Sequence, residues 1–168
     1  MTALEHPKSM QHTVQVITDE DPSFETKVIE IGGSLLEYCF DVGIPKGYLK
    51  KSNIFQALWI SDDDVTVAFA MVSRVQGIYK LQGVCVDPNY RNKGCATALV
   101  KKCESLLPAG SALRLCVDNC TDDTRWLCKW YERLGFECQN LGMICDDDGF
   151  DDERGDCEEI EFQKTVVV

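Results

Sequence analysis

The sequence predicts an α+β fold in which a mixed, mostly antiparallel sheet lies between helices. Short runs of alternating apolar residues indicate strands, and segments whose apolar residues recur every three or four positions indicate amphipathic helices. The 168 residues, of which 45% are hydrophobic, are sufficient to bury a sizeable core within one domain. No repeat or linker divides the chain, so we expect a single layered domain.

The first half of the chain is predicted to begin with a strand, a long helical region and a short helix. Alternation over 12–18 indicates the strand. Helix-spaced apolar residues over 21–40 indicate the helical region, which the flexible Gly32-Gly33 pair interrupts. The short helix is expected over 46–51, after a proline. Two further runs, 54–60 and 65–75, are expected to form a hairpin around the turn at 61–64.

The second half is predicted to alternate strands with two helices before a final hairpin. Pro108 ends the first of these helices, and Gly135 stops the second. The expected elements are a strand over 78–86, a helix from the Gly94 turn to Leu107, a strand over 112–118, a helix over 122–134, and a hairpin of the strands 136–145 and 160–167. The predicted inner faces are Ala96, Leu99, Val100, Cys103, Leu106 and Leu107 in the first helix, and Trp126, Leu127, Trp130, Tyr131 and Leu134 in the second.

The stretch from Val84 to Leu99 carries the strongest indication of function. A strand stops at Pro88, a loop with many backbone donors follows, and a helix begins in the turn that contains Gly94. Unpaired N–H groups and the positive end of the helix dipole converge at such a junction, which therefore binds anions. The loop is not a P-loop, because no Gly-Lys-Ser/Thr ends it, and it lacks the glycine spacing of a Rossmann turn.

Two sequence patterns resemble those of one enzyme family. The pattern Val-x-Val-x-Pro-x-Tyr-Arg-x-x-Gly-x-Ala, over 84–96, resembles the acetyl-CoA-binding motif of the GCN5-related N-acetyltransferase (GNAT) family, and 130–136 resembles its second signature. The resemblance covers 79–137. It implies the three-layer GNAT acyl-CoA N-acyltransferase fold, with one N-acetyltransferase domain over 12–168 after a flexible N-terminus over 1–11. The implied reaction is direct transfer of an acetyl group from acetyl-CoA to an amine.

The resemblance also implies which residues contact the cofactor. The loop N–H groups would hold the pyrophosphate of CoA with help from Arg91 and Lys93. The strand backbone would pair with the pantetheine arm, and a backbone N–H nearby would polarise the thioester carbonyl. Asn119 follows the strand 112–118 and is twelve residues before Tyr131, a longer spacing than in close relatives. The expected contacts are Val84, Cys85, Val86, Arg91, Asn92, Lys93, Gly94, Cys95, Ala96, Thr97 and Asn119.

Tyr131 is the candidate general acid, because it occupies the position of the tyrosine that protonates the departing CoA thiolate in many GNAT enzymes. The alternative is an aromatic side chain that only packs on the sheet. The sequence does not assign the general base. Relatives often hold a glutamate near the position of Gln82, and a glutamine cannot accept the proton. Asp118 and Glu37 are weaker candidates for that role, each with a solvated or ion-paired carboxylate as the alternative.

The acceptor is predicted from charge. Residues 146–161 hold ten acids against Arg154 and carry −9 of the net charge of −11. In the GNAT fold this segment would lie beside the acceptor entrance, where it would concentrate a cationic amine. We expect a diamine or polyamine, with a basic protein or peptide as the alternative and a non-catalytic CoA-binding regulatory domain as a third. A solvated loop without function also fits this segment. The expected acceptor rim is Asp146, Asp147, Asp148, Asp151 and Asp152.

Composition indicates the cellular compartment, the use of metals and the kinds of partner. Four of the ten cysteines fall at predicted core positions, where cysteine acts as a small hydrophobe, so a reducing, cytoplasmic compartment is expected. These four are Cys85, Cys103, Cys116 and Cys128. The chain has no Cys-x-x-Cys, and its two histidines lie near the N-terminus, so no metal is expected. Neither a membrane nor a nucleic-acid partner is expected, and the sequence does not decide whether the protein forms a homodimer.

Overall fold

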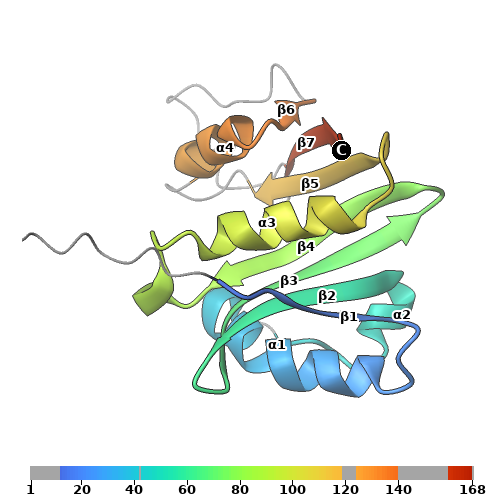
Figure 1. Cartoon of the computed structure of the whole chain (residues 1–168), viewed down its shortest axis with the longest axis vertical. Coiled ribbons are helices and arrows are strands. Elements are labelled where there is room, and N and C mark those ends of the chain that lie inside the picture. Colours follow the sequence, from blue (N-terminus) through green and yellow to red (C-terminus); the bar gives the residue numbers. More distant parts are fainter. Residues whose placement is uncertain (1–11, 42, 119–123, 140–158, 168) are drawn as a thin grey trace, which may run out of the picture.

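The computed structural model describes residues 12–41, 43–118, 124–139 and 159–167. In this part of the chain, one sheet lies between two layers of helices (Figure 1). The elements are β1 (Gln15–Thr18), α1 (Phe24–Phe40), α2 (Tyr48–Lys51), β2 (Ile54–Asp62), β3 (Val65–Val75), β4 (Ile78–Val86), the 3-10 turn η1 (Pro88–Tyr90), α3 (Cys95–Leu106), β5 (Ala112–Asp118), α4 (Thr124–Arg133), β6 (Glu137–Cys138) and β7 (Glu159–Thr165).

The strand order is β1-β2-β3-β4-β5-β7-β6, and every neighbouring pair is antiparallel except β4 and β5. The last strand of the chain therefore lies between β5 and β6. This arrangement confirms the predicted α+β class, the mostly antiparallel sheet and the final hairpin. The single parallel pair lies near the middle of the sheet, with α3 as its crossover (Figure 1).

The sheet separates two hydrophobic clusters. One cluster joins α3 and α4 to the sheet through side chains such as Leu99, Leu113 and Phe162, all of which have no exposed surface. The other joins α1 and α2 to the opposite face and includes Val28 and Phe69. The helices of each layer thus bury their apolar stripes against one face of the sheet, as the spacing of their apolar residues requires.

Helix α1 runs through Gly32-Gly33 without a break, so the predicted interruption is wrong. The reason is packing. A Cβ atom on Gly32 would lie 2.4 Å from Cζ of Phe69, a buried residue, whereas one on Gly33 would have no atom within 4 Å. The glycine at 32 lets the helix approach the sheet closely, and the tertiary contact outweighs the low helix propensity.

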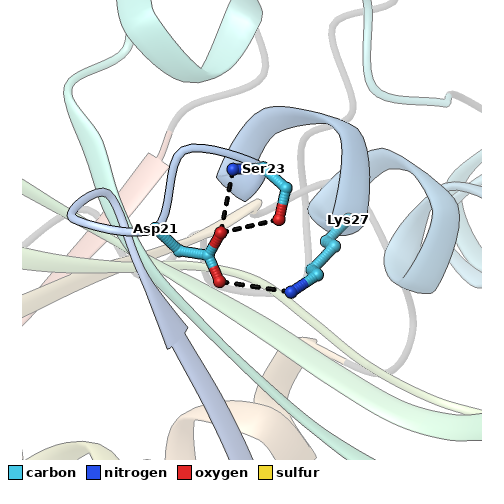
Figure 2. A network of polar contacts seen from close by, with 3 residues as sticks. All are labelled: Asp21, Ser23 and Lys27. Atoms are coloured by element: carbon cyan, nitrogen blue, oxygen red, sulfur yellow. Dashed lines mark hydrogen bonds and ion pairs between the residues drawn. The ribbon is translucent and has the colours of Figure 1, made fainter.

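The start of α1 is held by the carboxylate of Asp21 (Figure 2). The backbone N–H and the hydroxyl of Ser23 both donate to Oδ1, at 2.8 and 2.6 Å, and Lys27 Nζ donates to Oδ2 at 3.2 Å. These hydrogen bonds, first those from Ser23 and then that from Lys27, lower the pKa of Asp21 to about 2. Helix α1 accordingly begins at Phe24, three residues later than predicted.

Two of the predicted inner-face residues are exposed. Trp126 is 54% exposed and stacks on Trp130, and Leu106 is 43% exposed. Each lies at the margin of its helix stripe, where helical spacing cannot distinguish the core from its rim. Cys85 and Cys103 are buried, but Cys116 and Cys128 are only half-buried. The predicted flexible segment 1–11 and the predicted strand residues 140–145 lie outside the described residues.

Replacing Gly32 by alanine is expected to destabilise the protein by about 1–3 kcal/mol, because the added methyl group collides with the Phe69 ring. The matched control is Gly33→Ala, which has open space and is expected to stabilise the helix by up to about 1 kcal/mol. Urea denaturation of both variants measures the difference. Equal effects of the two substitutions would contradict this account of the packing.

Replacing Asp21 by asparagine is expected to lower the melting temperature at neutral pH and to have less effect as the pH falls. The folded-state pKa of Asp21 is about 2, below its ordinary value of 3.8, so its contribution is present above about pH 4 and is lost towards pH 2. Melting curves of both proteins across this range test the prediction. A gap between the two melting temperatures that stays constant down to pH 2 would contradict it.

Candidate active site

The parallel strands β4 and β5 pair over only a short length. Tyr79 pairs with Leu113 and Lys80 with Arg114, after which both strands continue without pairing to each other. Figure 1 shows them diverging towards the end of the sheet at which α3 begins. Strand backbone without a neighbour leaves N–H and C=O groups free to pair with an extended ligand. The second half of β4 is therefore a place where such a ligand can add to the sheet.

A β-bulge marks the point from which this second half of β4 begins. Met71 pairs with Gln82, whereas Phe69 pairs with Cys85, so one residue of β3 faces two residues of β4. Gly83, one of the two, has a φ of +59°, which favours glycine. A Cβ atom there would also lie 3.1 Å from Cε of Met71. A bulge bends its strand, and this one directly follows the segment in which the pairing of β4 with β5 ends, at Lys80.

The loop after β4 turns the chain directly into α3. Asp87 begins η1 and accepts a hydrogen bond from the N–H of Asn89 at 2.8 Å, and Arg91 Nε donates to the carbonyl of Val86 at 3.2 Å. Gly94, with a φ of +82°, precedes α3, and no side chain caps the helix. The first amides of α3 are left for water or a ligand, and with the helix dipole they favour an anion.

The side chains of the loop have defined neighbours. Lys93 Nζ lies 5.0 Å from the centroid of the Tyr90 ring, and the Tyr90 hydroxyl donates to Asp62, which raises the pKa of Tyr90. Cys95 is buried, and burial raises the pKa of its thiol, so its backbone rather than its sulfur is suited to an anion. Arg91 and Asn92 are exposed, while Ala96 and Thr97 are half-buried in the first turn of α3.

His12 also lies at this loop, which the sequence did not indicate. Its Nε2 donates to the carbonyl of Lys93, and its ring lies 3.8 Å from Sγ of Cys95. A pocket of about 210 Å³ is lined by His12 and Cys95 together with Thr13, Ile60, Ser61, Asp62, Val67 and Tyr90. Only the fold could reveal this placement, because 81 residues separate His12 from Lys93.

Tyr131 lies in α4, with its ring buried against the α3–α4 face of the sheet. The ring centroid is 4.6 Å from that of Trp130, 5.7 Å from that of Phe136 and 6.0 Å from that of Phe162. Burial raises the pKa of Tyr131 to about 12. The phenol therefore keeps its proton throughout the neutral range, so it can give a proton but is not a base.

The structure separates the other predicted catalytic residues. Glu37 is exposed on α1, in the layer opposite Tyr131, and Asp118 is the last residue of β5, with its side chain outside the described part. Gln82, at the position where relatives hold a base, donates from Nε2 to Oγ of Ser73 at 2.8 Å. Its Oε1 accepts from the hydroxyl of Tyr48 at 3.2 Å. Sequence reasoning missed this network, because Tyr48 and Ser73 carry no motif.

Asn119 and the predicted acceptor rim lie outside the described residues. The rim comprises Asp146, Asp147, Asp148, Asp151 and Asp152. Among the described side chains, no cluster of histidine, cysteine or acidic residues could hold a metal ion. No helix of the described chain has the length and apolar character to cross a membrane.

Known structures share this architecture across nearly the whole chain. The ribosomal-protein-S18-alanine N-acetyltransferase of Escherichia coli superposes with a TM-score of 0.62 at 16% identity, covering 93% of this chain and 96% of that chain. An aminoglycoside 6'-N-acetyltransferase complexed with coenzyme A superposes with a TM-score of 0.61 at 16% identity, covering 93% of this chain and 98% of that chain. A GNAT-family acetyltransferase of Bacillus cereus superposes with a TM-score of 0.62 at 14% identity, covering 93% of this chain and 99% of that chain. These identities show a shared fold.

The family follows from a sequence model. The model of the acetyltransferase (GNAT) domain matches residues 53–138, which span β2 to β6 and include the bulge, the loop and Tyr131. A comparison with curated proteins found no match. The uncapped α3 terminus and the unpaired backbone of β4 also fit a pyrophosphate with an amide-bearing arm. The chain belongs to the GNAT acetyltransferase family, whose members are acetyl-CoA-dependent N-acetyltransferases.

Proposed function

We propose that this protein transfers an acetyl group from acetyl-CoA directly to a primary amine. The observation that carries the proposal is the bulged β4 strand, which leaves β5 just before an uncapped α3 N-terminus. Strand β4 offers backbone amide and carbonyl groups in a row, and the N-terminus of α3 offers N–H groups that can bind an anion. Their order along the chain matches the order of the pantetheine arm and the pyrophosphate in CoA.

Each part of the site has a proposed task. The backbone of Val84 and Val86 pairs with the pantetheine arm, and the amides of 94–97 bind the pyrophosphate with Arg91 and Lys93. A backbone N–H of β4 stabilises the oxyanion that forms as the amine attacks the thioester. Tyr131 then protonates the CoA thiolate, for which a protonated phenol is suited. Cys85, Asn92 and Asn119 are proposed to complete the cofactor contacts.

The proposed acceptor is a small cationic amine, such as a diamine or polyamine. Its support is the acidic segment 146–161, which would raise the local concentration of a cation. A basic peptide uses the same electrostatics and is the second candidate. An assay of thiol release with acetyl-CoA and a panel of diamines, amino acids and lysine-rich peptides separates them. CoA binding without turnover on any acceptor would instead support a regulatory CoA-binding domain.

The base is proposed to be Asp118 or Glu37, acting through water, because Gln82 cannot accept a proton. An amine with a pKa near 10 arrives protonated and must lose a proton before it attacks. Asp118 ends β5, the strand from which β4 parts after Lys80. Glu37 is exposed on α1 and lies further from Tyr131, on the opposite layer. The two candidates are separated by comparing the pH dependence of kcat/KM in Asp118→Asn and Glu37→Gln variants.

Replacing Tyr131 by phenylalanine is expected to lower kcat about 100-fold and to leave CoA affinity nearly unchanged, because only the proton donor is lost. The ratio of the two kcat values should stay constant from about pH 7 to about pH 10, since the phenol remains protonated there. The matched control is Tyr79→Phe, another buried tyrosine of the same cluster. A Tyr131→Phe enzyme as fast as the Tyr79→Phe control would assign Tyr131 to packing alone.

Replacing Asp146, Asp147, Asp148, Asp151 and Asp152 by asparagine is expected to raise KM for a cationic amine severalfold at low ionic strength. The effect should shrink as salt rises, because salt screens exposed charges over about 10 Å at 0.1 M. Steady-state kinetics at several salt concentrations measure it. A KM that responds neither to the substitutions nor to salt would remove these residues from acceptor binding.

A further inference from the structure

The sheet face opposite α3 and α4 is polar over β4, β5 and β7. Tyr79, Leu113 and Phe162 belong to the α3–α4 cluster, so the residues next to them along each strand point to the other face. The apolar cluster on that other face, which α1 and α2 cover, contains no residue of β5 or β7. The polar side chains on this face are Lys80, Gln82, Arg114, Glu161 and Gln163, and they lie beside Ile78, Ala112 and Cys116.

Two cations lie side by side on this face. Lys80 and Arg114 are cross-strand partners, the last pair before β4 and β5 part. Like charges directly opposite each other in a sheet destabilise it. Arg114 has counterparts, since its Nε donates to Oε1 of Gln163 at 2.8 Å and its Nη1 lies 3.6 Å from Glu161. Within the described residues, Lys80 has no ion pair and no hydrogen bond from its side chain, so one positive charge of this group is not balanced.

The pair also lies at a defined distance from the proposed reaction centre. Lys80 precedes Val84 by four residues, which correspond to about 13 Å of strand, and the Lys80 side chain can span part of this. Between them, the Gln82 amide is held by Ser73 and Tyr48, so the path is lined by polar, fixed groups. A ligand group bound by Lys80 would therefore be separated from the reacting amine by several bonds.

We propose that Lys80 and Arg114 bind a carboxylate of the acceptor, so that the preferred substrate is an amine several bonds away from a carboxylate. This proposal rests on the proposed acetyl transfer and narrows its acceptor. Lysine and ornithine fit this arrangement, since each carries a side-chain amine several bonds away from a carboxylate that the basic pair can bind. A plain diamine lacks the carboxylate that Lys80 and Arg114 would bind.

Matched acceptors test the proposal, because lysine differs from cadaverine, and ornithine from putrescine, only by the carboxylate. The full-length enzyme should show a kcat/KM for lysine about 10- to 100-fold above that for cadaverine, the range for a hydrogen-bonded charge. Lys80→Met should bring this ratio close to one, mainly through KM, and Lys80→Arg should restore most of it. The control Lys101→Met, at an exposed position of α3, should keep the wild-type ratio.

Two results would overturn the proposal. One is a wild-type enzyme that uses cadaverine as well as lysine, and the other is a Lys80→Met variant with an unchanged ratio. Calorimetry with CoA and either N-ε-acetyl-lysine or N-acetylcadaverine gives a readout without turnover. If no amine is acetylated, the proposed function fails. In that case the carboxylate site is still tested by binding, and it fails if acetyl-lysine binds no more tightly than acetylcadaverine or if Lys80→Met leaves the difference intact.

Discussion

The structure depends on the bulge that Gly83 makes in β4. A regular β4 would stay paired with β5 along its length, and its backbone groups would all have partners within the sheet. The extra residue bends the strand after Gln82, so pairing with β5 ends at Lys80 and Arg114. The backbone that becomes available leads directly into the loop and the uncapped start of α3. One glycine with a positive φ thus creates the place where a ligand can join the sheet.

The two faces of the sheet carry different kinds of side chains. On one face, Tyr131 lies among aromatic rings, and burial that raises its pKa keeps the phenol protonated. On the other face, polar side chains of β4, β5 and β7 extend beyond the apolar cluster of α1 and α2. In the proposed reaction, the cofactor lies between the strands and the amine approaches from the polar face. The hydrophobic effect organises the first face, and charge is proposed to select the ligand on the second.

Local sequence patterns predicted most of the elements. The strands 78–86 and 112–118 match β4 and β5 at both ends, because a proline, a glycine or a turn stops each apolar run. The errors lie where packing decides. Gly32-Gly33 did not break α1, since the contact with Phe69 needs a glycine, and Trp126 lies outside the core although its spacing places it beside Trp130. The loop from Arg91 to Thr97 was predicted correctly as a strand–helix junction, because the motif is contiguous in the chain.

The sequence by itself determined the order of helices and strands, the strand–loop–helix junction at Gly94 and the family, since each depends on residues close together in the chain. Only the tertiary structure decided that β7 lies between β5 and β6, that His12 contacts the loop before α3, and that Lys80 lies beside Arg114. Strand register and side-chain packing join segments that are far apart in the chain. No periodicity within one segment carries that information.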